Sequence, residues 1–213
     1  MQFDFKNIDK INAIVFDLGG VIANIDYYLT VEAFKKLGVT DFDKQYGQFA
    51  QSDVFDKMEK GLISPSEFRN TVRTLTGVDM DDATFDKAWF AMLLDTPKER
   101  VDLIAKLKKK FKVYLLSNTN EIHIELYKKK VCAETSIDDF DKLFDVAYYS
   151  HTTHMKKPDN EIFLKVLNDN NLKADETLFI DDTYLNTVAA SKLGIQVYLL
   201  NDGKTIVDLF RNI

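Results

Sequence analysis

Ile11-Asn-Ala-Ile-Val-Phe-Asp17-Leu-Gly19-Gly20-Val21 is the stretch that decides the fold of this chain. Its apolar run ends at Asp17, and such a run bounded by turn residues is typical of a strand buried on both faces. Asp17 is then expected at the carboxyl end of the strand, where open α/β sheets present ligands. Gly19 and Gly20 allow a tight turn and a close approach of the backbone to a ligand. Taken alone, the stretch fits a structural aspartate that caps a turn equally well.

The composition is that of an ordinary globular protein, with 213 residues of which 46% are hydrophobic. A net charge of −6 argues against nucleic acid as a partner, although a local positive pocket can still hold a small phosphate ester. Cys132 is the single cysteine, so an internal disulfide is excluded and a reducing compartment is favoured. Neither a signal peptide nor a membrane-spanning run is present. We therefore expect a cytoplasmic protein, monomeric or homodimeric, with no membrane partner.

The chain divides into two kinds of sequence. From 24 to 96 it shows amphipathic helical patterns, and Ser64-Pro65-Ser66-Glu67 is a typical capping box. We expect an inserted helical domain there, with its aromatic stripe in the core. The segments 1–23 and 97–213 alternate strand and helix patterns, which predicts a parallel sheet with right-handed crossovers. The later strands are expected at 112–116, 143–149, 177–180 and 196–200, and Thr96-Pro97-Lys98-Glu99 is expected to cap the first helix of this part.

Polar side chains follow four of the expected strands. They are Asp17, Ser117-Asn118, Lys156-Lys157 and Asp181-Asp182. The carboxyl ends of parallel strands meet at one edge of a sheet, so these side chains are expected to lie close together. A nucleophilic carboxylate, a hydroxyl, a lysine and a carboxylate pair are the groups that phosphoryl transfer through an aspartyl-phosphate requires. Carboxylates crowded at one edge repel one another, and Mg²⁺ is the cation that suits them together with phosphate and water.

The order Asp17, Ser117, Lys157, Asp181-Asp182 resembles the haloacid dehalogenase (HAD) superfamily of hydrolases. The helical segment is similar to that family's α-helical C1 cap. Phe-Asp-Leu-Gly-Gly-Val, together with Leu-Leu-Ser-Asn and Asp-Asp-x-x-x-Asn, is most similar to the branch of glucose-1-phosphate phosphatases and the phosphatase domain of soluble epoxide hydrolases. The resemblance implies a Rossmann-like core and a Mg²⁺-dependent phosphatase acting on a small phosphorylated metabolite, for example a sugar-1-phosphate.

The resemblance also implies a role for each matched residue. Asp17 is expected to be the nucleophile and a Mg²⁺ ligand, and Lys157 to assist catalysis and hold the phosphoryl group. The remaining expected substrate-binding residues are Ser117, Asn118 and Gly20. The remaining expected metal ligands are the Gly19 carbonyl, Asp182 directly and Asp181 through water, with Asn186 securing the aspartate pair.

Two positions depart from the family pattern. Gly19 stands where most phosphatases of the superfamily carry an aspartate as general acid and base, a group that commonly contributes ~10²–10⁴-fold. A sugar-1-phosphate tolerates this loss best because its anomeric oxygen is a better leaving group, and Asp26 near the cap hinge is a candidate substitute. His154 stands where relatives often carry glycine. His151 and His154 could approach the site through their loop.

Two other functions remain open at this point. A metal-independent 2-haloacid dehalogenase fits the missing second aspartate, but it fits the Asp181-Asp182 pair poorly because adjacent carboxylates without a cation are costly. A regulatory protein that binds a phosphometabolite with low turnover is the non-enzymatic alternative. The presence of both Asp17 and Lys157 argues against it.

Overall fold

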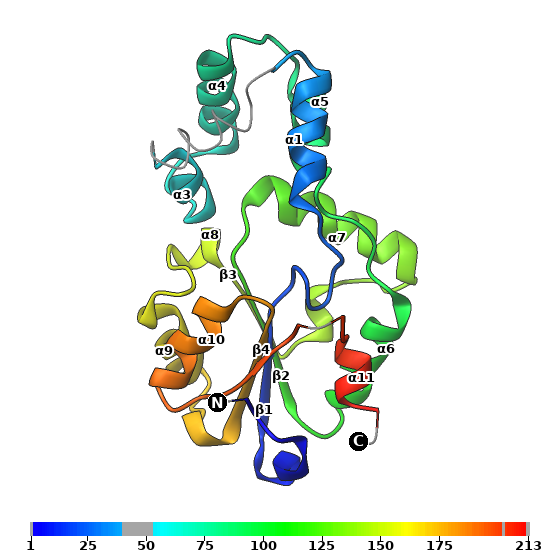
Figure 1. Cartoon of the computed structure of the whole chain (residues 1–213), viewed down its shortest axis with the longest axis vertical. Coiled ribbons are helices and arrows are strands. Elements are labelled where there is room, and N and C mark those ends of the chain that lie inside the picture. The colour runs from blue at the N-terminus through cyan, green and yellow to red at the C-terminus, as the bar shows by residue number, and fades with distance from the viewer. Residues whose placement is uncertain (1, 40–52, 202, 212–213) are drawn as a thin grey trace.

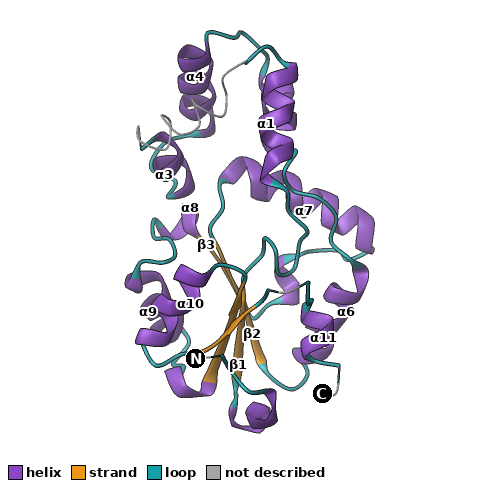
Figure 2. Cartoon of the chain, in the orientation of Figure 1, coloured by secondary structure: helices purple, strands orange, loops and turns teal. Residues whose placement is uncertain are grey.

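The computed structural model describes residues 2–39, 53–201 and 203–211. Its centre is one sheet of parallel strands in the order β3-β2-β1-β4-β5 (Figure 2), which confirms the predicted fold class. The strands are β1 (Ala13–Phe16), β2 (Lys112–Ser117), β3 (Val146–Tyr149), β4 (Thr177–Asp181) and β5 (Gln196–Leu199). β1 lies in the middle of the sheet, between β2 and β4. None of the helices within the described ranges has the length and apolarity that crossing a membrane requires.

Alternate residues of the central strands face two separate hydrophobic cores. Ile14 and Phe16 of β1 pack toward one core, and Ala13 and Val15 toward the other. The helices that cover the first face are α6 (Lys98–Leu107), α7 (Glu121–Thr135) and α11 (Ile206–Leu209). The helices on the second face are α9 (Asn160–Asp169) and α10 (Tyr184–Lys192), as Figure 1 shows. Helices thus cover both faces of the sheet, so every residue of β1 is buried, and each of them is apolar.

Two local predictions for this part of the chain are wrong. The strand expected at 143–149 begins only at Val146, because the preceding apolar residues belong to a short 3₁₀ turn, Asp141–Leu143, packed into the core. The capping box expected at Thr96 does not form, and α6 begins at Lys98 without a side-chain cap. The Thr96 hydroxyl is buried beside Tyr127 instead, and the two hydroxyl oxygens lie 2.7 Å apart. A buried hydroxyl takes the partner that the core offers.

The helices between 27 and 90 gather beyond the carboxyl ends of the strands (Figure 1). They are α1 (Tyr27–Lys36), α3 (Val54–Glu59), α4 (Pro65–Thr76) and α5 (Asp82–Phe90). The capping box at Ser64 is confirmed, because its hydroxyl accepts a bond from the Glu67 N–H and the Glu67 carboxylate accepts one from the Ser64 N–H. These helices share a hydrophobic cluster of their own, built around Phe34, Phe68, Phe85 and Trp89.

Two chain segments join this cluster to the sheet, and they run side by side. The Leu94 N–H donates to the Asn24 carbonyl at 3.0 Å, and the Asn24 N–H donates to the Asp95 carbonyl at 2.9 Å. Ile25 and Leu93 form a bridge next to them. The predicted limits of the helical cap, 24 and 96, fall in this double connection. The division into a core of 1–23 and 97–213 and a cap of 24–96 itself stays a prediction.

An aromatic stack joins the helical cluster to the first turn of α7. Trp89 of α5 stacks on the Phe55 ring of α3 at 5.5 Å and on the His123 imidazole of α7 at 5.0 Å. The His123 Nε2–H donates to the Trp89 carbonyl at 2.9 Å. Ile122 belongs to the same cluster. α5 is therefore attached to the sheet-bearing part of the molecule by buried apolar surface as well as by the chain itself.

Burial lowers the pKa of His123 from 6.5 to about 4, although its bond to the Trp89 carbonyl raises it. The unfolded chain therefore binds a proton in this window that the folded chain does not, and stability is lost as the pH falls from 6.5 toward 4. Between about pH 7 and about pH 4.5 the free energy of unfolding is expected to fall by about 2 kcal/mol more for the wild type than for His123→Gln. Urea titrations at the two pH values measure this difference. Parallel pH profiles for the two proteins would contradict the expectation.

Candidate active site

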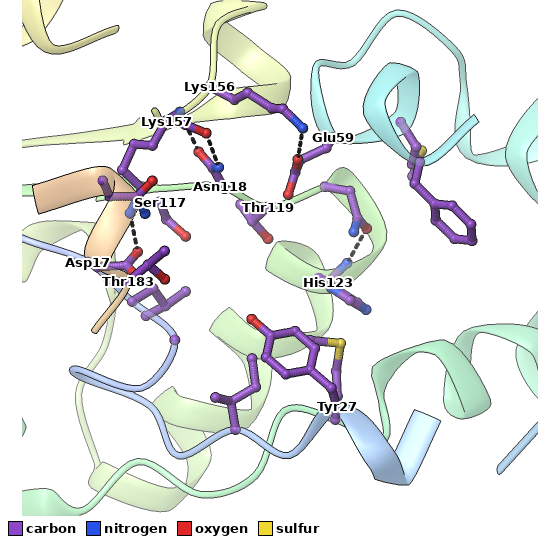
Figure 3. Close-up of a pocket in the computed structure, with 18 of the residues that line it drawn as sticks. Asp17, Tyr27, Glu59, Ser117, Asn118, Thr119, His123, Lys156, Lys157 and Thr183 are labelled. Carbon is purple, nitrogen blue, oxygen red and sulfur yellow. Dashed lines mark hydrogen bonds and ion pairs between the residues drawn. The ribbon is translucent and has the colours of Figure 1, made fainter. Parts of the chain in front are cut away.

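The polar strand ends meet at the carboxyl edge of the sheet, as predicted. Asp17 follows β1, Ser117 ends β2, and Asp182 follows β4. Lys157 arrives from the connection between β3 and α9, and its side chain reaches back to the same place (Figure 3). All four line one cavity of about 640 Å³ that lies between the sheet edge and helices α1, α3 and α5. The parallel sheet alone brings together residues that are up to 165 positions apart in the sequence.

Lys157 is the centre of a buried ion triad. Its ammonium lies 2.7 Å from Asp17 Oδ1 and 2.7 Å from Asp181 Oδ2. The exposed fraction is 2% for Lys157, 9% for Asp17 and 0% for Asp181. Asn118 holds the lysine backbone from the next strand, since its side-chain amide donates to the Lys157 carbonyl and its oxygen accepts from the Lys157 N–H. The position of the ammonium is therefore set by both its carboxylate partners and its own backbone.

The electrostatics of the triad show an excess of negative charge. Burial raises the pKa of Asp17 to about 7 against the opposing effect of the Lys157 ammonium, and Asp181 raises it further. Burial alone lowers the pKa of Lys157, but the two carboxylates outweigh it and raise this pKa above its usual range. Burial and the neighbouring Asp181 also raise the pKa of Asp182. When all are ionised, three carboxylates face one ammonium, so the site attracts a further cation.

The three aspartates fit a hard divalent cation. Asp17, Asp181 and Asp182 each offer a carboxylate oxygen, and these atoms lie within 4.8 Å of one another. Asp181 already accepts bonds from the Thr183 N–H at 2.7 Å and from the Asn186 amide at 3.1 Å. This arrangement fits the predicted division, in which Asp182 binds the metal directly and Asp181 through water. The Asn186 bonds fit its predicted role of securing the aspartate pair.

The two glycines after Asp17 have different surroundings. Gly19 lines the cavity. Gly20 lies against Asp182, which lines the cavity, and its contact with the substrate stays a prediction. It has a φ of +73°, and a methyl group there would overlap the Asp182 carboxylate. Glycine is required at this position by the left-handed backbone and by the close approach of Asp182.

Ser117 and Asn118 both line the cavity. The Ser117 side chain is 3% exposed and has no hydrogen-bond partner among the described residues, so its hydroxyl is available to a ligand. The side-chain amide of Asn118 is bonded at both ends to the Lys157 backbone. Asn118 therefore positions Lys157, in addition to lying beside the space where a substrate binds.

Asp26 and the loop histidines lie outside the cavity wall. The Asp26 carboxylate accepts from the Tyr28 N–H at 3.0 Å and caps α1, so the structure gives no support to Asp26 as the missing acid. His154 has a φ of +58°, a left-handed conformation that favours glycine. Its Nδ1–H donates to the Lys60 carbonyl at 2.8 Å. His151 packs against Gly61.

Several residues of the cavity wall are not among those that the sequence motifs predicted. They include Asp56 and Glu59 of α3, Asn120 and His123. The spacing of Asp56 and Glu59, three residues apart on one short helix, was the available signal. It could not be interpreted without knowing which face of α3 turns toward the sheet.

Carboxylates and a lysine that meet at the carboxyl ends of parallel strands, in a cavity covered by helices, define a class of α/β hydrolases. The sequence matches the haloacid dehalogenase-like hydrolase family over residues 11–194, and the chain belongs to this family. It is 34% identical to the D-ribitol-5-phosphate phosphatase of Bacteroides thetaiotaomicron, over 91% of this chain and 93% of that protein. It is 25% identical to a sesquiterpene phosphatase of Aspergillus oryzae, over 89% of this chain and 90% of that protein.

The solved structures agree with this assignment. A HAD family enzyme of Bacteroides thetaiotaomicron, in complex with magnesium and inorganic phosphate, superposes with a TM-score of 0.87. It is 38% identical and covers 94% of this chain and 100% of its own. The predicted family and fold class are thereby confirmed.

Proposed function

We propose that this enzyme is a Mg²⁺-dependent phosphatase that hydrolyses a small phosphorylated metabolite through an aspartyl-phosphate on Asp17. The observation that carries the proposal is the convergence of Asp17, Lys157 and two further carboxylates on one cavity. The phosphatase activity named for a relative that matches over 91% of the chain supports it, as does the solved homologue with magnesium and phosphate. Carboxylate-rich edges of this kind also disfavour a dehalogenase that works without metal.

The proposed reaction uses the chain's own residues in two displacements. A carboxylate oxygen of Asp17 attacks phosphorus, the bond between phosphorus and the alcohol oxygen breaks, and the leaving oxygen takes a proton from solvent water. A water molecule then attacks the phosphorus of the aspartyl-phosphate, the bond between phosphorus and Asp17 breaks, and phosphate leaves while the water's proton returns to solvent. Ser117 and Lys157 hold the phosphoryl oxygens, and Lys157 neutralises part of the charge that develops on them. Mg²⁺, when bound by Asp17, Asp182 and the Gly19 carbonyl, supplies electrostatic stabilisation of the phosphoryl group.

For the substrate we propose a phosphomonoester of a sugar or polyol. One candidate is a sugar-1-phosphate, because Gly19 stands at the usual position of the general acid and an anomeric oxygen leaves most readily without one. The ribitol-5-phosphate activity of the relative favours an ester of a primary alcohol instead. We place the enzyme in the cytoplasm on the basis of its single cysteine, and we propose that it is a monomer or a homodimer.

Phosphate release from a panel of sugar phosphates, polyol phosphates and p-nitrophenyl phosphate tests the proposal. With Mg²⁺ present, at least one ester is expected to be hydrolysed, and EDTA is expected to lower the rate by at least about 100-fold, with full recovery when Mg²⁺ is added in excess. A parallel assay with 2-chloropropionate measures halide release. Undiminished phosphate release in EDTA, or halide release without metal, would overturn the proposed metal dependence.

A further inference from the structure

Lys156, the residue before Lys157, binds two carboxylates of the helical segment. Its ammonium lies 2.8 Å from Asp56 Oδ1 and 2.8 Å from Glu59 Oε2, both on α3. All three residues line the cavity that holds Asp17 and Lys157. Figure 3 shows Lys156 extending from the Lys157 side of the cavity to Glu59. We call Asp56, Glu59 and Lys156 the acidic clasp.

The acidic clasp is fixed at both of its ends. On the side of the sheet, Lys156 adjoins Lys157, whose backbone is bonded twice to Asn118. On the side of α3, the Lys60 carbonyl accepts a bond from His154, and Gly61 lies so close to the His151 carbonyl that a methyl group would not fit. The clasp carboxylates are thus held at a set position relative to the phosphoryl site.

The charges of the acidic clasp suit hydroxyl groups. Both oxygens of Asp56 are paired, because its Oδ2 also lies 3.1 Å from the Lys60 ammonium. Glu59 pairs with Lys156 through Oε2 alone, so its Oε1 is an acceptor without an ion pair among the described residues. This oxygen can accept a hydrogen bond from an alcohol, which a purely apolar chain cannot supply.

The rest of the cavity wall points to the same type of ligand. Phe55, Met58 and Trp89 contribute apolar surface beside the acidic clasp, which suits the C–H groups of a polyhydroxylated chain.

We propose that Glu59, held together with Asp56 by Lys156, accepts a hydrogen bond from a hydroxyl group of the leaving alcohol and makes the enzyme selective for phosphomonoesters of polyhydroxylated compounds over those of apolar alcohols. This inference rests on the proposed phosphatase function. It assigns specificity to the acidic clasp and no step of the chemistry, which remains with Asp17 and Lys157.

The test uses two esters with the same number of carbons, ribitol 5-phosphate and n-pentyl phosphate. The wild type is expected to show a kcat/KM at least about 100-fold higher for the polyol ester. Glu59→Gln is expected to lower kcat/KM about 10-fold for ribitol 5-phosphate, mainly through KM, and less than about twofold for n-pentyl phosphate. The ratio of the two values, measured on one preparation, does not depend on the folded fraction.

Asp79→Asn is the matched control, because Asp79 is an exposed carboxylate of the helical segment that does not line the cavity. It is expected to leave the selectivity ratio unchanged. Equal losses on both esters in Glu59→Gln, or a wild type that does not prefer the polyol ester, would overturn the inference while leaving the phosphatase function intact. A wild type that releases phosphate from neither these esters nor p-nitrophenyl phosphate would overturn the proposed function itself.

Discussion

Asp17→Asn is expected to lower phosphate release by at least about 10⁴-fold, because an amide cannot replace the carboxylate that attacks phosphorus. The substitution keeps the size of the side chain and a carbonyl oxygen that can accept from the Lys157 ammonium, now 2.7 Å from Asp17 Oδ1. The fold is therefore expected to survive, and circular dichroism confirms or excludes this directly. Phosphate release from the best ester of the panel, with saturating Mg²⁺, measures the loss.

Asp26→Asn is the matched control for this experiment. Asp26 also lies on the connection that follows β1, but its carboxylate caps α1. Asparagine caps helices as well as aspartate does, so neither stability nor activity is expected to change more than about twofold. If phosphate release by Asp26→Asn fell by ~10²-fold or more, Asp26 would be the general acid in place of the aspartate that Gly19 replaces. Residual activity of Asp17→Asn within tenfold of the wild type would exclude the covalent mechanism.

Lys157→Met is expected to be the most destabilising single substitution in the site. It removes the ammonium that pairs with both Asp17 and Asp181 and leaves two buried carboxylates without this counter-charge. Breaking a buried ion pair from one side commonly costs about 3–5 kcal/mol, so the free energy of unfolding is expected to fall by about this amount. Urea unfolding in EDTA measures the fall. Activity at saturating Mg²⁺ is expected to drop by about 10³-fold, because the charge on the phosphoryl oxygens then lacks a partner.

Lys156→Met supplies the comparison, since it is the neighbouring lysine and also makes two ion pairs. The Lys156 side chain is 25% exposed, whereas that of Lys157 is 1% exposed. Ion pairs near solvent contribute about 0–1 kcal/mol, so this variant is expected to lose at most about 1 kcal/mol. Mg²⁺ is expected to restore part of the stability of Lys157→Met, because a divalent cation compensates Asp17 and Asp181. Equal stability losses for the two lysine variants would contradict the buried-triad account.

The parts of the site that the sequence predicted share one physical property. Asp17, Ser117 and Asp181-Asp182 each end a buried apolar strand, and the carboxyl ends of parallel strands meet at one edge whatever the loops do. Local patterns therefore sufficed to bring these side chains together. The same holds for the capping box at Ser64, whose bonds join residues only three positions apart.

The errors arose where tertiary packing outweighed a local pattern. Thr96 begins a sequence typical of a helix cap, but its hydroxyl is buried beside Tyr127 and bonds to the Tyr127 hydroxyl instead. Leu143 and Phe144 before Val146 suit a strand, yet they pack into the core from the end of a 3₁₀ turn. In each case the deciding contact joins residues that are distant in the chain or on a neighbouring strand.

The sequence by itself determined the parallel α/β core, the family and the residues of the strand-end cluster, because burial patterns and strand polarity are local properties. Only the tertiary structure decided that Lys157 is shared by two buried aspartates, and that Lys156 joins α3 to the same cavity. Those contacts depend on how two loops and a distant helix pack against one another. That packing follows from the shapes of many side chains together, which no short stretch of sequence records.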